Sequence, residues 1–140
     1  MQNILVLCVG NICRSPLAEA LLAQKLPQYQ ISSAGLSAMI GWPADAKAQD
    51  IATEHGLDIA AHRAQQVTRV MCQYAELILV MEQAHKTRLE QKFPLVRGKT
   101  FRLGHFSDFD VADPYRQPRA AFDHAWDAIA RGVADWIQHI

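Results

Sequence analysis

Residues 8–15, CVGNICRS, place a thiol, a glycine, an asparagine and an arginine in one short turn. Gly10 and Asn11 permit the backbone conformations in which successive amides converge on one point, and such a nest binds anions. The planar guanidinium of Arg14 can donate to two oxygens of a tetrahedral oxyanion. The spacing therefore predicts an anion-binding turn with the sulfur of Cys8 at its base.

The positive field of this turn gives Cys8 its predicted chemistry. Such a field favours the thiolate over the thiol, and the thiolate is the nucleophile. A helix that begins near Ser15 adds free N–H groups and the positive end of its dipole. We expect Ser15 to cap that helix, Pro16 to take its first position, and the Ser15 hydroxyl to donate to the sulfur. The predicted phosphate-binding residues are Val9, Gly10, Asn11, Ile12, Cys13, Arg14 and Ser15.

Other interpretations of the turn fit the sequence less well. A cysteine at the end of a strand is often only a small buried hydrophobe, but that leaves Gly10 and Arg14 unexplained. Cys8 and Cys13 lack a second ligand pair, and the six histidines show no metal-ligand spacing, so we expect no metal and no cofactor. The Gly-x4-Gly-Lys-Ser/Thr pattern of nucleotide-binding loops does not occur.

The elements that must position this turn alternate along the chain. Continuous apolar runs predict strands covered on both faces at residues 3–9 and 76–81, and weaker strands are expected at 28–35 and 98–104. Helices are predicted from Ser15 onward, at 44–56, at 82–93 and from Arg119 to the end. This alternation predicts a three-layer α/β fold, with a four-stranded parallel sheet, helices on both faces and the phosphate loop between the first strand and the first helix.

Composition excludes several classes of protein. The 140 residues suffice for one domain with a real core, and 50% of them are hydrophobic, which argues against disorder. Lys plus Arg equals Asp plus Glu at 14 each, so the net charge indicates neither nucleic acid nor an anionic membrane as partner. Three cysteines without a disulfide pattern favour a reducing compartment. We expect a single cytoplasmic domain, 1–140, that is monomeric and does not insert into membranes.

These motifs resemble the low-molecular-weight protein tyrosine phosphatases, and within them the bacterial branch. The family signature Cys-x5-Arg-Ser/Thr is matched by CVGNICRS, and its Asp-Pro pair near the C-terminus by DPY at residues 113–115. The resemblance covers the whole chain, including SSAG at 32–35 and HRAQQV at 62–67. It implies a phosphatase that removes phosphate from a phosphotyrosine protein, a bacterial tyrosine autokinase of an exopolysaccharide or capsule system.

The resemblance identifies Asp113 as the proton donor to the leaving group. A phenol has a pKa of about 10, so a phenolate departs more easily when a general acid protonates it. Pro114 holds Asp113 in an extended backbone, whereas Asp108 and Asp110 fit solvated loop acids or helix caps. The implied intermediate is a phospho-cysteine on Cys8. Asp113 would then act as the base that activates water, while Arg14 and the loop amides carry the phosphoryl charge.

The resemblance also implies the walls of a substrate slot. Tyr115 would form one wall, and residues 36–42 the other, through either Met39 or Trp42, which the sequence does not separate. Ile12 would add an apolar surface. In the related protein-arginine phosphatases that position is typically Thr, so Ile12 favours an aromatic substrate. Animal enzymes carry a second aromatic residue where Arg116 stands here, which fits the bacterial branch.

Asn11, Ser33 and His62 match family positions whose hydrogen bonds support the loop; without the resemblance, Ser33 and His62 would be ordinary surface or strand-end residues. Cys13 lies in the same turn as Cys8 and is the predicted redox partner, able to trap a sulfenic acid as a disulfide. Cys72 fits a packed thiol.

Three rival functions remain open at this point. An arsenate reductase would use a similar loop but needs a further pair of resolving cysteines, and only Cys72 follows. A protein-arginine phosphatase would share the fold and is disfavoured by Ile12. A non-catalytic phosphate-binding module would gain nothing from a thiolate and a placed acid.

Overall fold

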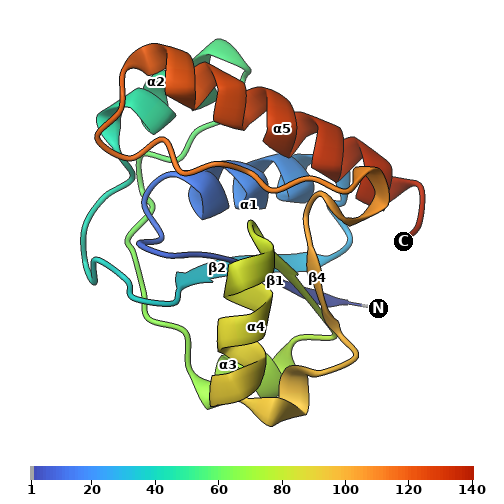
Figure 1. The fold of residues 1–140 in the computed structure, drawn as a ribbon. Coiled ribbons are helices and arrows are strands. Elements are labelled where there is room, and N and C mark those ends of the chain that lie inside the picture. Colours follow the sequence, from blue (N-terminus) through green and yellow to red (C-terminus); the bar gives the residue numbers. More distant parts are fainter. Residues whose placement is uncertain (1) are drawn as a thin grey trace.

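The computed structural model describes residues 2–140, and its centre is a sheet of four parallel strands in the order β2-β1-β3-β4. Helices cover both faces of this sheet (Figure 1), which confirms the predicted α/β architecture. The strands are β1 (Asn3–Cys8), β2 (Gln30–Gly35), β3 (Leu77–Val80) and β4 (Thr100–Arg102). The helices are α1 (Arg14–Lys25), α2 (Ala46–Glu54), α3 (Arg69–Tyr74), α4 (Gln83–Lys92) and α5 (Arg119–Ile137), with short 3-10 turns η1 (Pro94–Val96) and η2 (His105–Ser107).

The central strands are apolar throughout because both of their faces are buried. Along β1, Ile4 and Val6 point into a core shared with α1, α2 and α5, whereas Leu5 and Leu7 point into a core shared with α3 and α4. Figure 1 shows these two groups of helices on opposite sides of the sheet. Alternate side chains of a strand face opposite ways, so a strand between two cores requires the unbroken run that the sequence displays.

Helix α5 lies across α1 and closes the larger core. Its buried residues recur every three or four positions, as an amphipathic helix requires, and the helix ends at Ile137. The large buried side chains of this stripe are Phe122, Trp126, Ile129, Val133 and Trp136.

Two helical features differ from the sequence-based expectation. Helix α1 begins at Arg14 with Cys13 at its N-cap, so Ser15 and Pro16 lie inside the first turn. The Ser15 side chain is therefore not the cap, and no side-chain hydrogen bond caps this end. The short helix α3 was not expected, because its six residues span under two turns and show no clear period.

The loop that follows β1 lies at the carboxyl edge of the sheet, where open α/β folds place their ligands. The neighbouring end of β2 approaches it closely. A Cβ built on Gly35 would lie 2.5 Å from the carbonyl oxygen of Val9, so any larger residue there would push the loop away. Gly35 thereby lets the β2 end pack directly under the loop.

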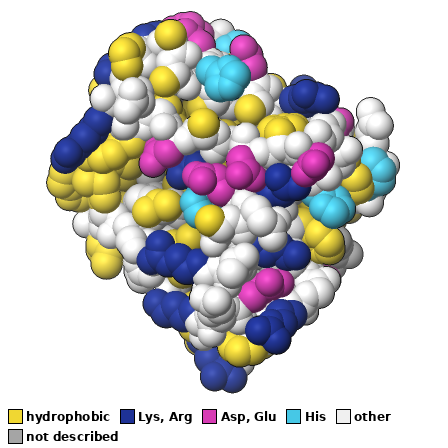
Figure 2. Space-filling model, in the orientation of Figure 1, with side chains coloured by type: hydrophobic (Ala, Val, Ile, Leu, Met, Phe, Trp, Pro, Cys, Tyr) yellow, Lys and Arg dark blue, Asp and Glu magenta, His cyan; other side chains and the backbone are white. Residues whose placement is uncertain are grey.

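The surface carries charges of both signs. Figure 2 shows acidic side chains in the middle of the face seen in Figure 1, with Lys and Arg interspersed around them. Within residues 2–140, no helix combines the length and the apolar character needed to cross a membrane.

Candidate active site

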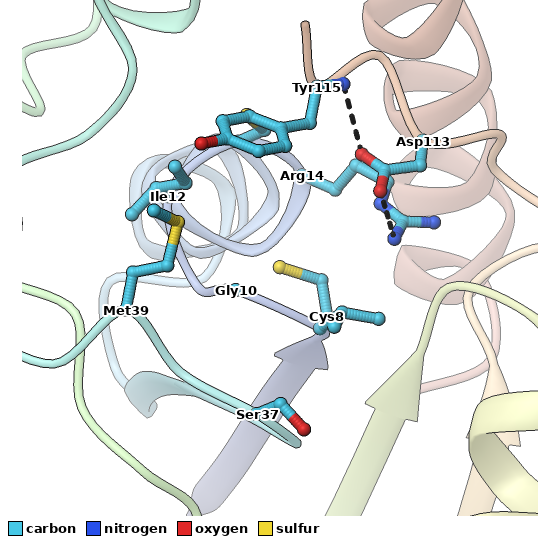
Figure 3. Close-up of a pocket in the computed structure, with 10 residues that line it drawn as sticks. Cys8, Gly10, Ile12, Arg14, Ser37, Met39, Asp113 and Tyr115 are labelled. Carbon is cyan, nitrogen blue, oxygen red and sulfur yellow. Dashed lines mark hydrogen bonds and ion pairs between the residues drawn. The ribbon is translucent and has the colours of Figure 1, made fainter.

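A cavity of about 140 Å³ opens at the carboxyl end of β1. The sulfur of Cys8 points into it, with Met39 and Ile12 on one side, Asp113 on the other and the Tyr115 ring above (Figure 3). Residues from three distant parts of the sequence therefore meet at the predicted nucleophile. The lining residues are Cys8, Val9, Gly10, Ile12, Cys13, Arg14, Ser37, Met39, Asp113 and Tyr115.

The carbonyl groups of the phosphate loop are held by the segment that follows β2. The amides of Leu36, Ser37 and Met39 donate to the carbonyl oxygens of residues 8, 9 and 10 at 2.9–3.0 Å, and the amide of Asp45 donates to that of residue 12 at 2.8 Å. Within residues 2–140, by contrast, the main-chain amides of residues 9–13 donate to no protein group. A loop whose carbonyl oxygens are engaged and whose amides are unpaired can offer those amides to an anion.

Asn11 fixes the shape of the loop from inside. Its backbone is left-handed, with φ of 60°, as its predicted tolerance of that region allows. Its side-chain amide donates to Ser15 Oγ at 2.8 Å and to Ser33 Oγ at 3.0 Å, and its Oδ1 accepts from the amide of Gln65 at 3.0 Å. His62 Nε2 lies 2.7 Å from the carbonyl oxygen of Asn11 and donates to it. Asn11, Ser33 and His62 are thus brought together around the loop.

The same network orients a hydroxyl toward the sulfur. Ser33 Oγ donates its hydrogen to Glu19 at 2.6 Å and accepts one from Asn11. Ser15 Oγ likewise accepts from Asn11, which leaves its own hydrogen for Cys8 Sγ at 2.9 Å. A hydroxyl donor stabilises a thiolate more than a thiol. The hydroxyl of Ser15 therefore acts on the sulfur as expected, although it does not cap the helix.

Arg14 is buried, and its guanidinium has one anchored edge. Its Nη1 donates to Glu82 at 2.5 Å and to the carbonyl oxygen of Val111 at 2.8 Å. Its Nη2 lies 3.7 Å from Asp113 Oδ2. In the part of the chain that the structure describes, Nε and Nη2 make no hydrogen bond, so this second edge is available to two oxygens of an oxyanion.

Asp113 reaches the cavity from the loop between β4 and α5. Its Oδ1 accepts from the amide of Tyr115 at 3.1 Å, and its side chain is 47% exposed. The other two aspartates of this loop have structural partners instead. Asp108 pairs with Arg102, and Asp110 both pairs with Arg102 and accepts from the amide of Gln83 at the start of α4. They are the surface acid and helix cap that the sequence favoured.

The structure separates the two candidates for the second wall. Met39 lines the cavity opposite Tyr115 (Figure 3), whereas Trp42 is 53% exposed and lies outside the lining. The expectation that Trp42 forms this wall is therefore not met. The turn from Met39 to Trp42 reverses the chain and directs the two side chains to different places.

The three cysteines are all free and buried. Cys13 lines the cavity with Cys8, and burial, together with the nearby Asp45 carboxylate, raises the pKa of its thiol. Cys72 packs in the other core, across the sheet, as a packed thiol should. Burial also raises the pKa of Cys72.

The sequence analysis did not predict the roles of two residues at the site. Glu82 anchors Arg14, and His85 lies behind it with Nε2 3.4 Å from the same carboxylate oxygen. Burial lowers the pKa of His85, and the adjacent Arg14 lowers it further. A signal was present for Glu82, because it follows the β3 run directly and so lies at the ligand-binding edge of the sheet. For His85, the sequence offered no comparable signal.

Known proteins match this chain over nearly its whole length. A family model described as low molecular weight phosphotyrosine protein phosphatase matches residues 3–140. A probable low molecular weight protein-tyrosine-phosphatase of Ralstonia nicotianae, EpsP, is 48% identical over 140 residues, which make up 100% of this chain and 97% of that protein. Vibrio vulnificus Wzb, solved in complex with benzylphosphonate, has a TM-score of 0.96 and 42% identity over 99% of both chains.

A further neighbour has a different stated activity. The YwlE arginine phosphatase of Geobacillus stearothermophilus has a TM-score of 0.91 and 34% identity, covering 99% of this chain and 94% of that one. The family match over nearly the full length and the 48% identical relative nevertheless agree with each other and with the site. This chain belongs to the low molecular weight protein-tyrosine-phosphatase family, a family of hydrolases.

Proposed function

We propose that this protein hydrolyses phosphotyrosine in proteins through a phospho-cysteine on Cys8, with Asp113 as general acid and then general base. The observation that carries the proposal is the run of amides at residues 9–13 that have no acceptor among the described residues, in the loop that lines one cavity with Cys8. Those donors, the open edge of Arg14 and the hydroxyl of Ser15 suit a phosphoryl group above a thiolate.

In the first step, the Cys8 thiolate attacks phosphorus while the bond from phosphorus to the tyrosine oxygen breaks. Asp113 gives its proton to the departing phenolate oxygen. The dianionic substrate helps here, because a nearby negative charge favours the protonated carboxyl. The loop amides and the Nε and Nη2 groups of Arg14 carry the charge on the equatorial oxygens.

In the second step, the Asp113 carboxylate takes a proton from water, and the water oxygen attacks phosphorus. The phosphorus–sulfur bond breaks, inorganic phosphate leaves, and the Cys8 thiolate is restored. The Ser15 hydroxyl, 2.9 Å from the sulfur, stabilises the thiolate as leaving group. One water molecule is consumed for each inorganic phosphate released.

The walls of the cavity support an aromatic substrate. Ile12, Met39 and Tyr115 are apolar surfaces between which a ring can lie, and no carboxylate other than Asp113 lines this cavity within the described residues to pair with a guanidinium. Benzylphosphonate, an aromatic ring with a phosphonate, is the ligand in the Vibrio vulnificus Wzb complex. Both facts favour phosphotyrosine over phosphoarginine.

Arsenate reduction is disfavoured by the position of the third cysteine. Cys72 packs in the core on the far side of the sheet from Cys8 and Cys13. It would have to leave that core to relay a disulfide.

The decisive experiment measures hydrolysis of p-nitrophenyl phosphate and of a phosphotyrosyl peptide. We expect no measurable turnover by Cys8→Ser, and near wild-type turnover by Cys72→Ser, the matched control at a buried cysteine outside the site. Rapid acid quench of the wild type during turnover should trap phosphate on Cys8, identified by mass spectrometry. Turnover by Cys8→Ser within tenfold of the wild type would overturn the mechanism, and preference for phosphoarginine or arsenate would overturn the substrate.

We further propose that the physiological substrate is a bacterial tyrosine autokinase of an exopolysaccharide or capsule system. Support comes from the resemblance to the bacterial branch and from the similarity to EpsP. The protein would act as a monomeric single domain, 1–140, in the cytoplasm. Loss of phosphotyrosine from an autophosphorylated kinase, followed by immunoblot with the Cys8→Ser variant as control, tests this assignment.

We also propose that Cys13 protects Cys8 from irreversible oxidation. Peroxide converts the Cys8 thiolate to a sulfenic acid, and the Cys13 thiol condenses with it to a disulfide, releasing water. Both cysteines line the same cavity. Because burial raises the pKa of Cys13, few molecules carry the attacking thiolate, and the condensation should be slow. Unaltered recovery of peroxide-treated Cys13→Ser after reduction would contradict this role.

A further inference from the structure

Two large apolar side chains are exposed beside the mouth of the active site. Ile40 is 69% exposed and Trp42 is 53% exposed, and both belong to the turn that starts at Met39, a wall of the cavity. Next to a substrate cavity, two such side chains offer apolar surface to a bound protein. The other exposed large hydrophobic side chains among the described residues are Val70, Tyr74 and Phe106.

The turn that carries Ile40 and Trp42 is rigid. The amide of Trp42 donates to the carbonyl oxygen of Met39 at 3.0 Å, and Gly41 has φ of +83°, as the third position of a type II turn requires. The amide of Gly41 donates to the carbonyl oxygen of Ala64 at 2.9 Å, and the amide of Ala64 donates back to Trp42 at 2.9 Å. The exposed pair is therefore not part of a loose loop.

The turn is also tied to the phosphate loop. The amide of Met39 donates to the carbonyl oxygen of Gly10 at 3.0 Å, and a Cβ on Gly10 would lie 3.6 Å from the Met39 sulfur. Whatever docks on Ile40 and Trp42 therefore has a fixed position relative to the bound phosphate. Little ordering is needed on the enzyme side, which preserves binding free energy.

We propose that Ile40 and Trp42 form a docking surface for an apolar side chain next to the phosphotyrosine of the substrate protein. The inference rests on the proposed function, because it places the phosphotyrosine ring against Met39. A β-turn keeps its first and fourth Cα atoms within about 7 Å, and an extended peptide advances about 3.3 Å per residue. A side chain one or two positions from the phosphotyrosine thus reaches this surface.

The opposite side of the mouth has a different character. There Arg116 lies over the Tyr115 ring, 5.3 Å from its centroid, and Asp113 is half exposed. One side of the entrance is therefore apolar and the other charged. A peptide with its apolar residue on the wrong side of the phosphotyrosine would lose the contact, so the surface should select direction as well as composition.

The test compares three substrates: p-nitrophenyl phosphate and two phosphotyrosyl peptides that differ only in carrying Leu or Ser on both sides of the phosphotyrosine. We expect Trp42→Ala and Ile40→Ser to lower kcat/KM for the Leu peptide about 5- to 30-fold, the loss of one buried apolar contact. The change should lie mostly in KM. Turnover of p-nitrophenyl phosphate and of the Ser peptide should stay within about twofold of the wild type.

Tyr74→Ala is the matched control, since Tyr74 is 65% exposed on α3 and does not line the cavity. It should change none of the three rates. Equal losses on all substrates in Trp42→Ala would overturn the proposal in favour of a structural role for the turn. No loss on the Leu peptide would also overturn it, as would a dimer in wild-type sedimentation that Trp42→Ala converts to a monomer. Failure of the proposed function would look different, because the wild type itself would not hydrolyse phosphotyrosine.

Discussion

The phosphate loop and the acid loop, residues 103–118, meet at one cavity but are held in different ways. In the phosphate loop, Asn11, Arg14 and Ser15 are at most 2% exposed, and each carbonyl oxygen of residues 8–12 accepts a hydrogen bond from another segment. In the acid loop, Asp113 is about half exposed, and its side chain contacts only its own turn and Arg14 within the described residues.

The difference shows which half of the site is formed before substrate arrives. The phosphate loop is preorganised, because its shape depends on buried hydrogen bonds that no ligand replaces. The position of Asp113 depends partly on Arg14, the group that we propose binds the phosphate. Substitutions should therefore affect phosphate binding and proton transfer separately, and vanadate inhibition and turnover measure the two effects.

Asp113→Asn should give the largest effect and should damage proton transfer alone. Hydrolysis of phenyl phosphate should fall about 10²–10⁴-fold in kcat, as for a lost general acid, with a much smaller loss on p-nitrophenyl phosphate, whose leaving group needs little help. Competitive inhibition by vanadate measures the other half of the site. It should be unchanged or slightly stronger, since a carboxylate near Arg14 has been neutralised. Weaker vanadate binding would show that Asp113 also contributes to anion binding, so that the two halves of the site are not separable.

Arg14→Lys should damage the preorganised half while keeping the charge. Lysine cannot donate to Glu82 and Val111 on one side and to two phosphate oxygens on the other. We expect kcat/KM for p-nitrophenyl phosphate to fall about 10²–10³-fold, and vanadate inhibition to weaken as well. Steady-state kinetics on both substrates provides the measurement. A loss below tenfold would show that charge alone suffices at this position.

Asn11→Ala tests the hydrogen bonds that support the loop. The substitution leaves Ser15 Oγ and the Gln65 amide without their partner and places alanine at φ of 60°. We expect the free energy of unfolding in urea to fall by about 2–4 kcal/mol. Gln117→Ala, at an exposed position of the acid loop, is the control and should change it by less than about 0.5 kcal/mol. Similar values for the two variants would remove the contrast between the loops.

His85→Gln should produce the smallest effect, visible in the pH dependence of stability. Burial and Arg14 lower the pKa of His85 in the folded protein, whereas an unfolded histidine titrates near pH 6.5. The unfolded state therefore binds the proton more readily, and the wild type should lose stability as the pH falls below about 6.5. The variant should lose less between pH 7.5 and 5.5 in urea unfolding. Equal slopes would mean that His85 titrates normally.

The sequence predicted the preorganised half of the site better than the segments around it. Residues 8–15 are contiguous, so the turn chemistry of Gly10 and Asn11 and the strand before them define the cradle locally. Asp113 could be separated from Asp108 and Asp110 only through the following proline and the family resemblance. The distinction between Met39 and Trp42 depended on a turn whose direction is set by Gly41 and by bonds to Ala64, which the sequence alone does not reveal.

Long-range partners were the hardest to predict. Glu82 lies 68 positions from Arg14 in the sequence, and only the β1–β3 pairing brings the two together. The helix starts two residues earlier than predicted: Ser15 was expected as its N-cap, whereas Cys13 takes that position and Ser15 donates to the sulfur instead. Local sequence thus predicted the conformation of the loop, whereas the residues that hold it come from distant parts of the chain.

Because its carbonyl groups face away from the cavity, the phosphate loop can bind anions but not cations. Those oxygens already accept hydrogen bonds from residues 36–45 and from His62, so a divalent cation entering the cavity finds no free carbonyl oxygen on residues 8–12. A tetrahedral oxyanion instead finds the amide hydrogens of the loop. The loop thus selects ions by the sign of their charge before any covalent step. Vanadate, tungstate and sulfate should compete with substrate according to size and charge.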